Sequence, residues 1–446
     1  MSELLDVARR VAQQARPGEQ VEAYVARSKR VSVRAYQGEV EALTSAESSG
    51  IGVRVIVDKR MGFAHAGTLD EGAIGEALSE ARDNAQFGEI DEWNGLAEPD
   101  GVEPPDLDLY RPELASFPTD QKVELALELE RAILAGDPRI TGVRVASYGD
   151  GSGEAAIATS TGIAVSSRAT SCWLSAQALA SDDGEVQIGY GVDVGRQQDE
   201  LDVDETARDA VERATRMLGA RQPKSQRLTV VLDPRIAASF LSIIGGTLTG
   251  ERVLKGRSPF ADRMGDAIAA PVLTLIDDAT NPDSLGADAH DGEGLATRPN
   301  CLIDGGTLRT FLHNSYTARR AGTVSTGSAA RGYSSRPTVG CLALIPGAGD
   351  KTPEELYALV GDGLLVQDVT GLHSGVNAVS GDFSVGAEGV MIRGGALAEP
   401  VREITLASTL QRMLLDIHAV GSDLEWLPGG DAGVSLVIGD VSLSGS

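Results

Sequence analysis

The pattern of apolar and polar residues in the first third of the chain predicts one helix followed by strands. Apolar residues in 3–15 recur at intervals of three and four, which is the spacing of an amphipathic helix. Short valine-rich runs with turn residues between them then predict an antiparallel meander. Its strands are expected at 21–28, 31–36, 40–45, 52–57 and 62–66. A helix over 70–85 follows, and 97–118, dense in Pro, Asp and Glu, is typical of a long surface connection.

The next part of the chain alternates again between helical and strand patterns. Thr119 is placed to cap a helix, and Asp202 to open another. Between them, strands are expected at 142–147, 155–159, 164–179 with a break, and 187–194. Residues 220–226 have no apolar period, so we place a domain boundary there. The predicted domains are an N-terminal α+β domain over 1–220 and a C-terminal, β-rich domain over 227–446.

The second half begins with a strand at 228–232 and a helix for which Asp233 suits the N-cap and Pro234 the first position. The buried stripe of this helix is expected to consist of Ile236, Phe240, Leu241, Ile244 and Leu248. Further strands are expected at 272–277, 300–304, 308–314, 363–369, 386–393 and 434–443. Helices are expected to start at Thr352, in a capping-box pattern, and at Ser408. The fold class is therefore α+β, with two domains of antiparallel sheets and packed helices.

Charge and composition narrow the classes of partner. The chain has 446 residues and a formal net charge of −26, which disfavours contact with nucleic acid because phosphate is repelled. No apolar run is long enough to span a membrane, and the acidic start at 1–6 does not resemble a signal peptide. We therefore expect a cytoplasmic protein without membrane contact. The three cysteines lie far apart, which indicates neither a disulfide framework nor a thiolate metal site.

Local catalytic motifs are weak. Five isolated histidines, His65, His290, His313, His373 and His418, form no local zinc motif, which leaves only a zinc site assembled from distant residues as an alternative. His373 and Ser374, with Asp382 following, contain the residue types of a hydrolytic triad. No G-x-S-x-G elbow is present, so we interpret them as a turn before a strand. The glycines of 347–363 match no phosphate-binding motif, and nucleotide binding has no support.

A more specific signal comes from the helix 233–247 and the segment that follows it, Gly250-Glu251-Arg252-Val253-Leu254-Lys255-Gly256-Arg257-Ser258-Pro259-Phe260. This frame resembles the metalloprotease subunit of the TldD/PmbA family, in which the same helix bears His-Glu-x-x-x-His. By that resemblance the two imidazole positions hold Ser242 and Thr247, and the glutamate position holds Ile243. A hydroxyl is a poor zinc ligand and isoleucine cannot act as a general base.

Other segments extend the resemblance over the whole chain, most clearly from residue 228 onwards. Ser380-Gly381-Asp382-Phe383-Ser384 with Gly386-Ala387-Glu388-Gly389 is similar to the PmbA (TldE) branch of the family. In the TldD branch a cysteine near the C-terminus completes the zinc site, whereas the matching stretch here, 427–433, has none. By this resemblance, all of the family's metal-site positions hold other residue types in this chain.

The resemblance implies a non-catalytic subunit, inactive alone, of a heterodimeric zinc metalloprotease that processes peptides or unfolded segments. It implies no cofactor in this chain, zinc in a TldD-like catalytic partner, and a homodimer when the chain is alone. The alternatives are a homodimeric peptide-binding or scaffold protein without proteolytic activity and, as a lesser one, an independent hydrolase. The residues expected to contact a cavity or a partner are Glu251, Arg252, Arg319, Arg320, Ser374, Asp382 and Phe383.

Overall fold

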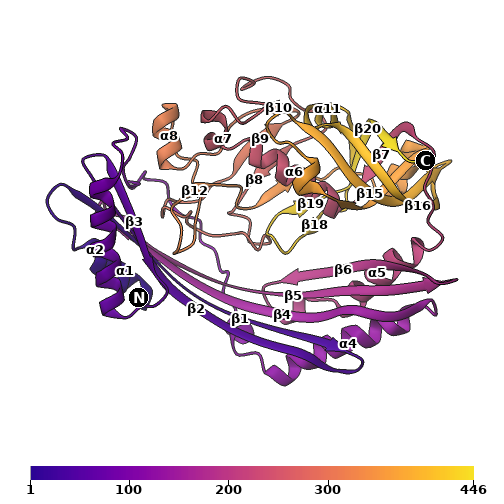
Figure 1. The fold of residues 1–446 in the computed structure, drawn as a ribbon, viewed down its shortest axis with the longest axis horizontal. Helices are drawn as coiled ribbons and strands as arrows, with labels where there is room; N and C mark the ends of the chain where they lie inside the picture. The colour runs from indigo at the N-terminus through magenta and orange to yellow at the C-terminus, as the bar shows by residue number, and fades with distance from the viewer. Residues whose placement is uncertain (1) are drawn as a thin grey trace.

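The structure is a computed structural model, and it describes residues 2–446. Figure 1 shows a long curved sheet built by the first half of the chain and a second body, orange to yellow, on its concave side. A segment of the second body returns to the sheet. A Cβ added at Gly50 would lie 2.5 Å from the ring of Tyr333. A Cβ added at Gly52 would lie 2.2 Å from the Tyr333 carbonyl oxygen. Glycine at both positions therefore allows this close docking.

The sheet of the first body has six antiparallel strands in the order β3-β2-β1-β4-β5-β6. They are β1 (Glu19–Tyr36), β2 (Glu39–Val57), β3 (Arg60–Ala66), β4 (Ile140–Thr159), β5 (Ala164–Asp182) and β6 (Glu185–Gly195). The expected meander is present as β1, β2 and β3, and the sheet continues from β1 to β4.

These strands are longer than the sequence pattern predicted. The runs predicted separately at 21–28 and 31–36 both belong to β1, β2 and β4 likewise each join two predicted runs, and β5 has no break. The polar residues that suggested interruptions keep their place in the ladder, as Lys29 does opposite Glu47 of β2 and Ser152 of β4. An exposed polar side chain does not end a strand when the strands on both sides continue.

Helices cover this sheet over two separate cores. The helices are α1 (Glu3–Ala12), α2 (Glu71–Phe87), α3 (Pro112–Ala115), α4 (Thr119–Gly136) and α5 (Val203–Arg216), with a short 3-10 turn at Gln198–Glu200. α1 and α2 bury one apolar cluster against the sheet, and α4 and α5 bury another. Figure 1 shows α4 on the convex side, opposite the second body. The side chain of Asp202 caps α5 by accepting a hydrogen bond from the N–H of Glu205, as the sequence predicted.

The second body is built on a six-stranded sheet in the order β16-β15-β14-β7-β20-β17. Its strands are β7 (Gln226–Leu232), β14 (Gly363–Thr370), β15 (Asp382–Arg393), β16 (Ala396–Thr409), β17 (Ile417–Val420) and β20 (Leu436–Ser444). Pairing of β16 with β20 closes five of the strands into a small barrel. β7 and β14 are parallel, while the other pairs in this sheet are antiparallel. The α+β class with antiparallel sheets is confirmed.

Two local predictions in this body were wrong. Residues 308–314 were expected to form a strand, but only Thr307–Leu308 does (β10). The Leu312 N–H donates instead to the Leu248 carbonyl oxygen, and the Leu312 carbonyl oxygen accepts from the Gly250 N–H. The helix expected to start at Ser408 begins later, as α11 (Leu410–Leu415). Its N-cap is Thr409, since Ser408 still pairs with β15.

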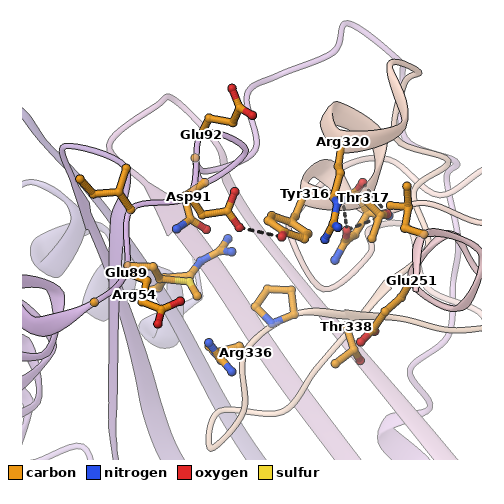
Figure 2. A pocket seen from close by; sticks show the side chains of 18 of the residues that line it. Arg54, Glu89, Asp91, Glu92, Glu251, Tyr316, Thr317, Arg320, Arg336 and Thr338 are labelled. Atoms are coloured by element: carbon orange, nitrogen blue, oxygen red, sulfur yellow. Dashed lines mark hydrogen bonds between the residues drawn. The ribbon is translucent and has the colours of Figure 1, made fainter. Parts of the chain in front are cut away.

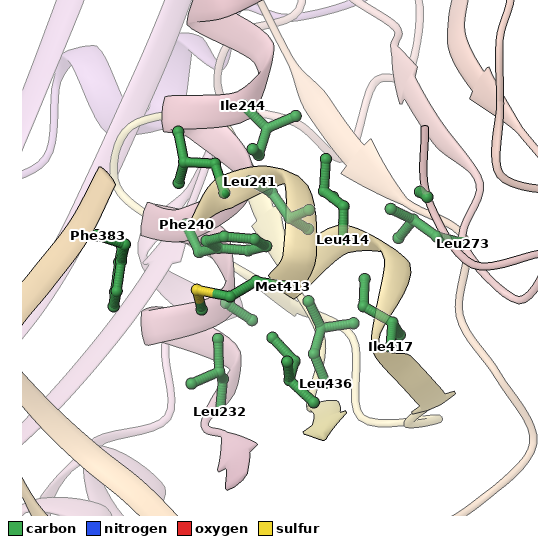
Figure 3. Packing of buried hydrophobic residues seen from close by; sticks show 14 of the residues in the cluster. Leu232, Phe240, Leu241, Ile244, Leu273, Phe383, Met413, Leu414, Ile417 and Leu436 are labelled. Atoms are coloured by element: carbon green, nitrogen blue, oxygen red, sulfur yellow. The ribbon is translucent and has the colours of Figure 1, made fainter. Parts of the chain in front are cut away.

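The helix predicted after Asp233 is α6 (Pro234–Thr247), and its cap is as expected: the Asp233 side chain accepts a hydrogen bond from the N–H of Arg235. Phe240, Leu241, Ile244 and Leu248 are buried, while Ile236 is partly buried. Figure 3 shows this face packed against α11 and β20. The barrel core thus fixes the orientation of α6.

Shorter elements connect these parts. They are α7 (Gly250–Leu254), β8 (Leu275–Asp277), β9 (Asn300–Asp304), α8 (Ser315–Ala321), β11 (Ala329–Ala330), β12 (Thr338–Val339), β13 (Leu344–Pro346), α9 (Pro353–Val360), α10 (Leu372–Gly375), β18 (Glu425–Trp426) and β19 (Ala432–Gly433). Thr352 and Glu355 form the predicted capping box of α9. Among residues 2–446 no helix is long and apolar enough to cross a membrane.

Candidate functional site

The three positions at which the resemblance places a metal motif lie on the last two turns of α6, but they face different surroundings. Ser242 is exposed, Ile243 is partly buried against the barrel core, and Thr247 is fully buried. The Thr247 hydroxyl donates a hydrogen bond of 2.6 Å to the carbonyl oxygen of Ile244. The Thr247 hydroxyl is thus engaged within the helix, whereas the Ser242 hydroxyl bonds to Asp431 outside it.

The stretch 427–433 lies beside α6, where the resemblance expects the cysteine ligand. A Cβ at Gly433 would come within 2.0 Å of the Pro234 carbonyl oxygen, which shows how tightly the β18–β19 turn packs on the helix. Burial raises the pKa of Asp431 in this turn, while hydrogen bonds from the Leu344 N–H and the Ser242 hydroxyl oppose that rise. The stretch therefore offers α6 a carboxylate and tight backbone packing instead of a thiol.

A second carboxyl group lies close to this turn. Asp277 is 1% exposed, and one of its oxygens accepts hydrogen bonds of 2.8 and 2.9 Å from the N–H groups of Leu342 and Ala343. Burial raises the pKa of Asp277 to about 6 despite these bonds, and the charges of Asp431 and Asp278 add to the rise. The Cys341 thiol lies near both acids, and burial together with their charges raises its pKa well above the ordinary value, so it stays protonated.

The rest of the described chain supplies no metal centre either. Among residues 2–446, no group of three or more His, Cys, Asp or Glu side chains is arranged to hold a metal ion. His65, His373 and His418 are exposed. His313 is buried against Gly250, and burial lowers its pKa. The residues present at the family's metal positions therefore do not fit zinc.

The candidate triad residues are not hydrogen-bonded to one another. The Ser374 hydroxyl donates to the Gly371 carbonyl oxygen at 3.3 Å, and Asp382 accepts from the Ser380 hydroxyl at 2.7 Å. Both residues are exposed, Ser374 in α10 and Asp382 at the start of β15. Phe383, which we expected at a cavity or partner surface, is a core residue instead: it is 6% exposed and packs edge-on against Phe240, with ring centroids 6.4 Å apart.

A cavity of about 710 Å³ lies between the two bodies. Figure 2 shows its side chains, which come from β2 and β3, from the segment 88–95, from α7 and α8 with residues that flank them, and from 336–338 at the start of β12. Two of the predicted contact residues, Glu251 and Arg320, line it. Arg252 is exposed on α7 but is not part of the lining.

Arg319, the neighbour of Arg320, joins the two bodies. Its guanidinium group donates to the carbonyl oxygens of Trp93, Gly95 and Leu96 at 2.9, 2.6 and 3.3 Å. Arg319 was expected to contact a cavity or a partner, but its donors are occupied within the chain. The cation instead holds the segment 88–96 against α8.

Beneath the cavity lies a buried network of two arginines and two glutamates. Arg54 donates to both carboxylate oxygens of Glu22, at 3.1 and 2.7 Å, and lies 3.5 Å from Glu293. Arg331 also pairs with Glu22. Glu22 and Glu293 are 0% exposed and Arg54 is 5% exposed. Burial alone would raise the pKa of Glu22, but the charges and hydrogen bonds of Arg54 and Arg331 lower it.

Reasoning from the sequence did not single out this network. Its signal was present in the first body, since Glu22 and Arg54 each interrupt an apolar run inside a predicted strand. A charged residue on the buried face of a strand needs a partner. The identity of the partner could not be read from the pattern, because Glu293 and Arg331 lie more than two hundred residues away along the chain.

Comparison with known families accounts for most of the chain. Residues 21–85 match the model of PmbA/TldA metallopeptidase domain 1, residues 112–218 that of the central domain, and residues 225–445 that of the C-terminal domain. These matches define a metallopeptidase-type protein. The chain belongs to the PmbA/TldD family.

Curated relatives and solved structures agree with this assignment. The chain is 29% identical to the metalloprotease PmbA of Escherichia coli O157:H7 over 407 residues, which cover 91% of this chain and 88% of the relative. It is 27% identical over 436 residues to a PmbA homologue of Haemophilus influenzae, covering 96% and 93% of the two chains. The structure of TldE from Thermococcus kodakarensis shares the fold, with a TM-score of 0.88, 24% identity, and coverage of 96% and 97%.

Proposed function

We propose that this chain is the non-catalytic subunit of a TldD/TldE-type heterodimeric zinc metalloprotease that processes peptides or unfolded segments. The observation that carries the proposal is α6, where the imidazole and glutamate positions hold Ser242, Ile243 and Thr247. The side chain of Ser242 is exposed, whereas that of Thr247 is buried. Neither supplies an imidazole, and the stretch 427–433 supplies no thiol.

Within this proposal the zinc belongs to a TldD-like partner, and the present chain contributes surface and stability. The packing of α6 supports a structural role for the helix, since its apolar face fills the barrel core. We expect the pair to form in the cytoplasm, in keeping with three cysteines that are free thiols. The chain alone would then hydrolyse no peptide and pair with itself.

Co-expression with a chain that carries His-Glu-x-x-x-His tests the proposal. The two chains should co-purify, and only the pair or the partner should cleave an unfolded protein substrate in a chelator-sensitive manner. Mutating the glutamate of the partner's motif should abolish cleavage by the complex. Cleavage by the present chain alone, at the rate of the complex, would contradict the proposal.

The alternative, a homodimeric peptide-binding protein, is favoured by the cavity of about 710 Å³, because a binding protein needs a pocket but no catalytic metal. The same experiment separates the two functions. A binding protein of this kind would remain a homodimer in the presence of the candidate partner.

A further inference from the structure

The cavity between the two bodies contains a buried guanidinium group with a free donor. Arg54 uses Nε and Nη2 on Glu22 and Glu293, whereas its Nη1 has no hydrogen-bond partner among residues 2–446. Arg54 is 5% exposed and lines the cavity (Figure 2). Its position is fixed by two carboxylates, so this donor is held in place before any ligand arrives.

Two more guanidinium groups line the same cavity without a carboxylate partner. Arg320 on α8 and Arg336 in the loop before β12 form no ion pair with any residue in 2–446. The Tyr316 hydroxyl is the side-chain contact of Arg320. Together with Arg54 they place three guanidinium groups around one cavity of an acidic chain, which suits an anionic ligand.

Acidic residues also line the cavity, but two of them are already engaged. Asp91 accepts hydrogen bonds from the Tyr316 hydroxyl and from the Trp93 N–H, at 2.7 and 3.0 Å. Glu251 pairs with Lys255 at 2.5 Å. Glu92 points away from the other labelled side chains in Figure 2. Glu89 remains as an exposed acid of the lining that forms no ion pair among the described residues.

We propose that this cavity binds the carboxyl-terminal end of a peptide, with the terminal carboxylate held by Arg320 and Arg336 over the Arg54 Nη1 donor. A planar carboxylate matches the paired donors of a guanidinium group. A volume of about 710 Å³ lies in the range of sites for ligands of several residues, and a single inorganic anion would leave most of it empty. Glu89 is then placed to accept from N–H groups of the peptide.

The choice of a peptide among carboxylate ligands rests on membership of a metallopeptidase family. It does not depend on the proposed pairing with a catalytic subunit. The site lies on this chain alone, so binding can be measured without a partner and without zinc. A failure to bind would leave the subunit proposal standing, and a failure to find a partner would leave the cavity proposal standing.

The test uses the purified full chain and two pools of randomised hexapeptides with an N-terminal fluorescein. One pool has a free C-terminal carboxylate and the other a C-terminal amide. In fluorescence anisotropy titrations at low salt, the free-acid pool should bind about tenfold more tightly than the amide pool, as expected for loss of a charge-assisted hydrogen bond. Equal binding of the two pools, or no binding of either at millimolar protein, would overturn the proposal.

Variants then locate the site. Arg320→Gln and Arg336→Gln should each weaken binding of the free-acid pool about tenfold and leave the amide pool unchanged. Arg252→Gln is the matched control, because Arg252 is exposed on α7 beside the cavity but does not line it. These side chains are exposed, so the fold should be retained, and circular dichroism checks it. A loss with Arg252→Gln equal to that of the cavity variants would refute the assignment.

Competition separates the peptide from simpler anions. At equal ionic strength, inorganic phosphate should displace the free-acid pool no better than chloride does, because several residues of the peptide contact the cavity. Displacement by low-millimolar phosphate would show that the cavity holds small anions and would overturn the peptide part of the proposal.

Discussion

The Tyr316 hydroxyl donates a hydrogen bond of 2.7 Å to Oδ2 of Asp91, and so connects α8 of the second body with the segment that follows α2 in the first. Burial raises the pKa of Tyr316, and the bond to Asp91 raises it further, so the phenol stays a donor at neutral pH. Arg319 adds three bonds to the same segment. One wall of the cavity is thereby held by side chains of both bodies.

Replacing Arg54 with Gln should destabilise the protein by roughly 3–5 kcal/mol, because two buried carboxylates lose a cation. Urea unfolding followed by circular dichroism measures the change. Lys29→Gln is the control on the neighbouring strand, since Lys29 and its partner Glu47 are 53% and 73% exposed. That change should cost less than about 1 kcal/mol. Equal effects of the two substitutions would show that the network contributes no more than a surface pair.

The isolated protein should hold far less than one zinc per chain. The family's ligand positions hold Ser242 and Thr247, and 427–433 lacks a cysteine. Elemental analysis after dialysis in a buffer without chelator measures the content. About one zinc per chain, retained through dialysis, would contradict the prediction.

The triple variant Ser242→His, Ile243→Glu, Thr247→His should still fail to cleave an unfolded substrate when zinc is supplied. A catalytic zinc needs a third protein ligand and groups that orient the imidazoles, and neither is restored. The structure adds that the residue at 247 is fully buried, so a histidine there overpacks the site at a cost of roughly 1–3 kcal/mol.

Ile243→Glu alone should also lower stability, since Ile243 packs against the barrel core. Ser242→His alone, at an exposed position, is the control and should change stability little. Chelator-sensitive cleavage by the triple variant would mean that the remaining parts of an active site persist in this chain.

Asp277→Asn should alter how stability depends on pH. The folded-state pKa of Asp277, about 6, lies above the ordinary value of 3.8, so the folded protein binds this proton more tightly than the unfolded chain does. The stability from this group is therefore fully present below about pH 4 and is lost as the pH rises through about 6.

The asparagine keeps an oxygen for the N–H groups of Leu342 and Ala343 and cannot ionise. Between pH 4 and 7 the variant should therefore lose less of its free energy of unfolding than the natural protein, by up to roughly 3 kcal/mol. Urea titrations at several pH values decide the matter. Parallel profiles for the two proteins would refute the assignment.

Local signals explain which parts of the fold could be predicted. Asp233 and Pro234 predicted the start of α6, and Thr352 with Glu355 predicted that of α9, because a cap is a contact between residues close in sequence. Strand ends were harder, as Ser408 shows: it was read as a helix start, yet it pairs with Phe383 of β15. Such pairing depends on residues that the local pattern does not contain.

The candidate site was likewise predictable only where the signal is local in sequence. The resemblance identified α6, but nothing in the sequence indicated that Ser242 faces solvent while Thr247 is buried, since burial depends on how the barrel surrounds the helix. Glu251 and Arg320 were expected near a cavity and do line one. Arg54, the buried cation that also lines it, was missed because Glu293, one of its two partners, comes from a distant segment.

The pairing of Glu22 with Arg331 spans 309 residues of sequence, and this separation bears on the order of events during synthesis. The first body can collapse on the ribosome from local contacts, but at that stage Glu22 and Arg54 still lack Glu293 and Arg331. Until the chain has grown past residue 331, the nascent sheet carries the charged groups of Glu22 and Arg54 on a face destined for burial, without their two remaining partners. That charge should keep water on the unfinished face and delay docking until the partner residues have emerged.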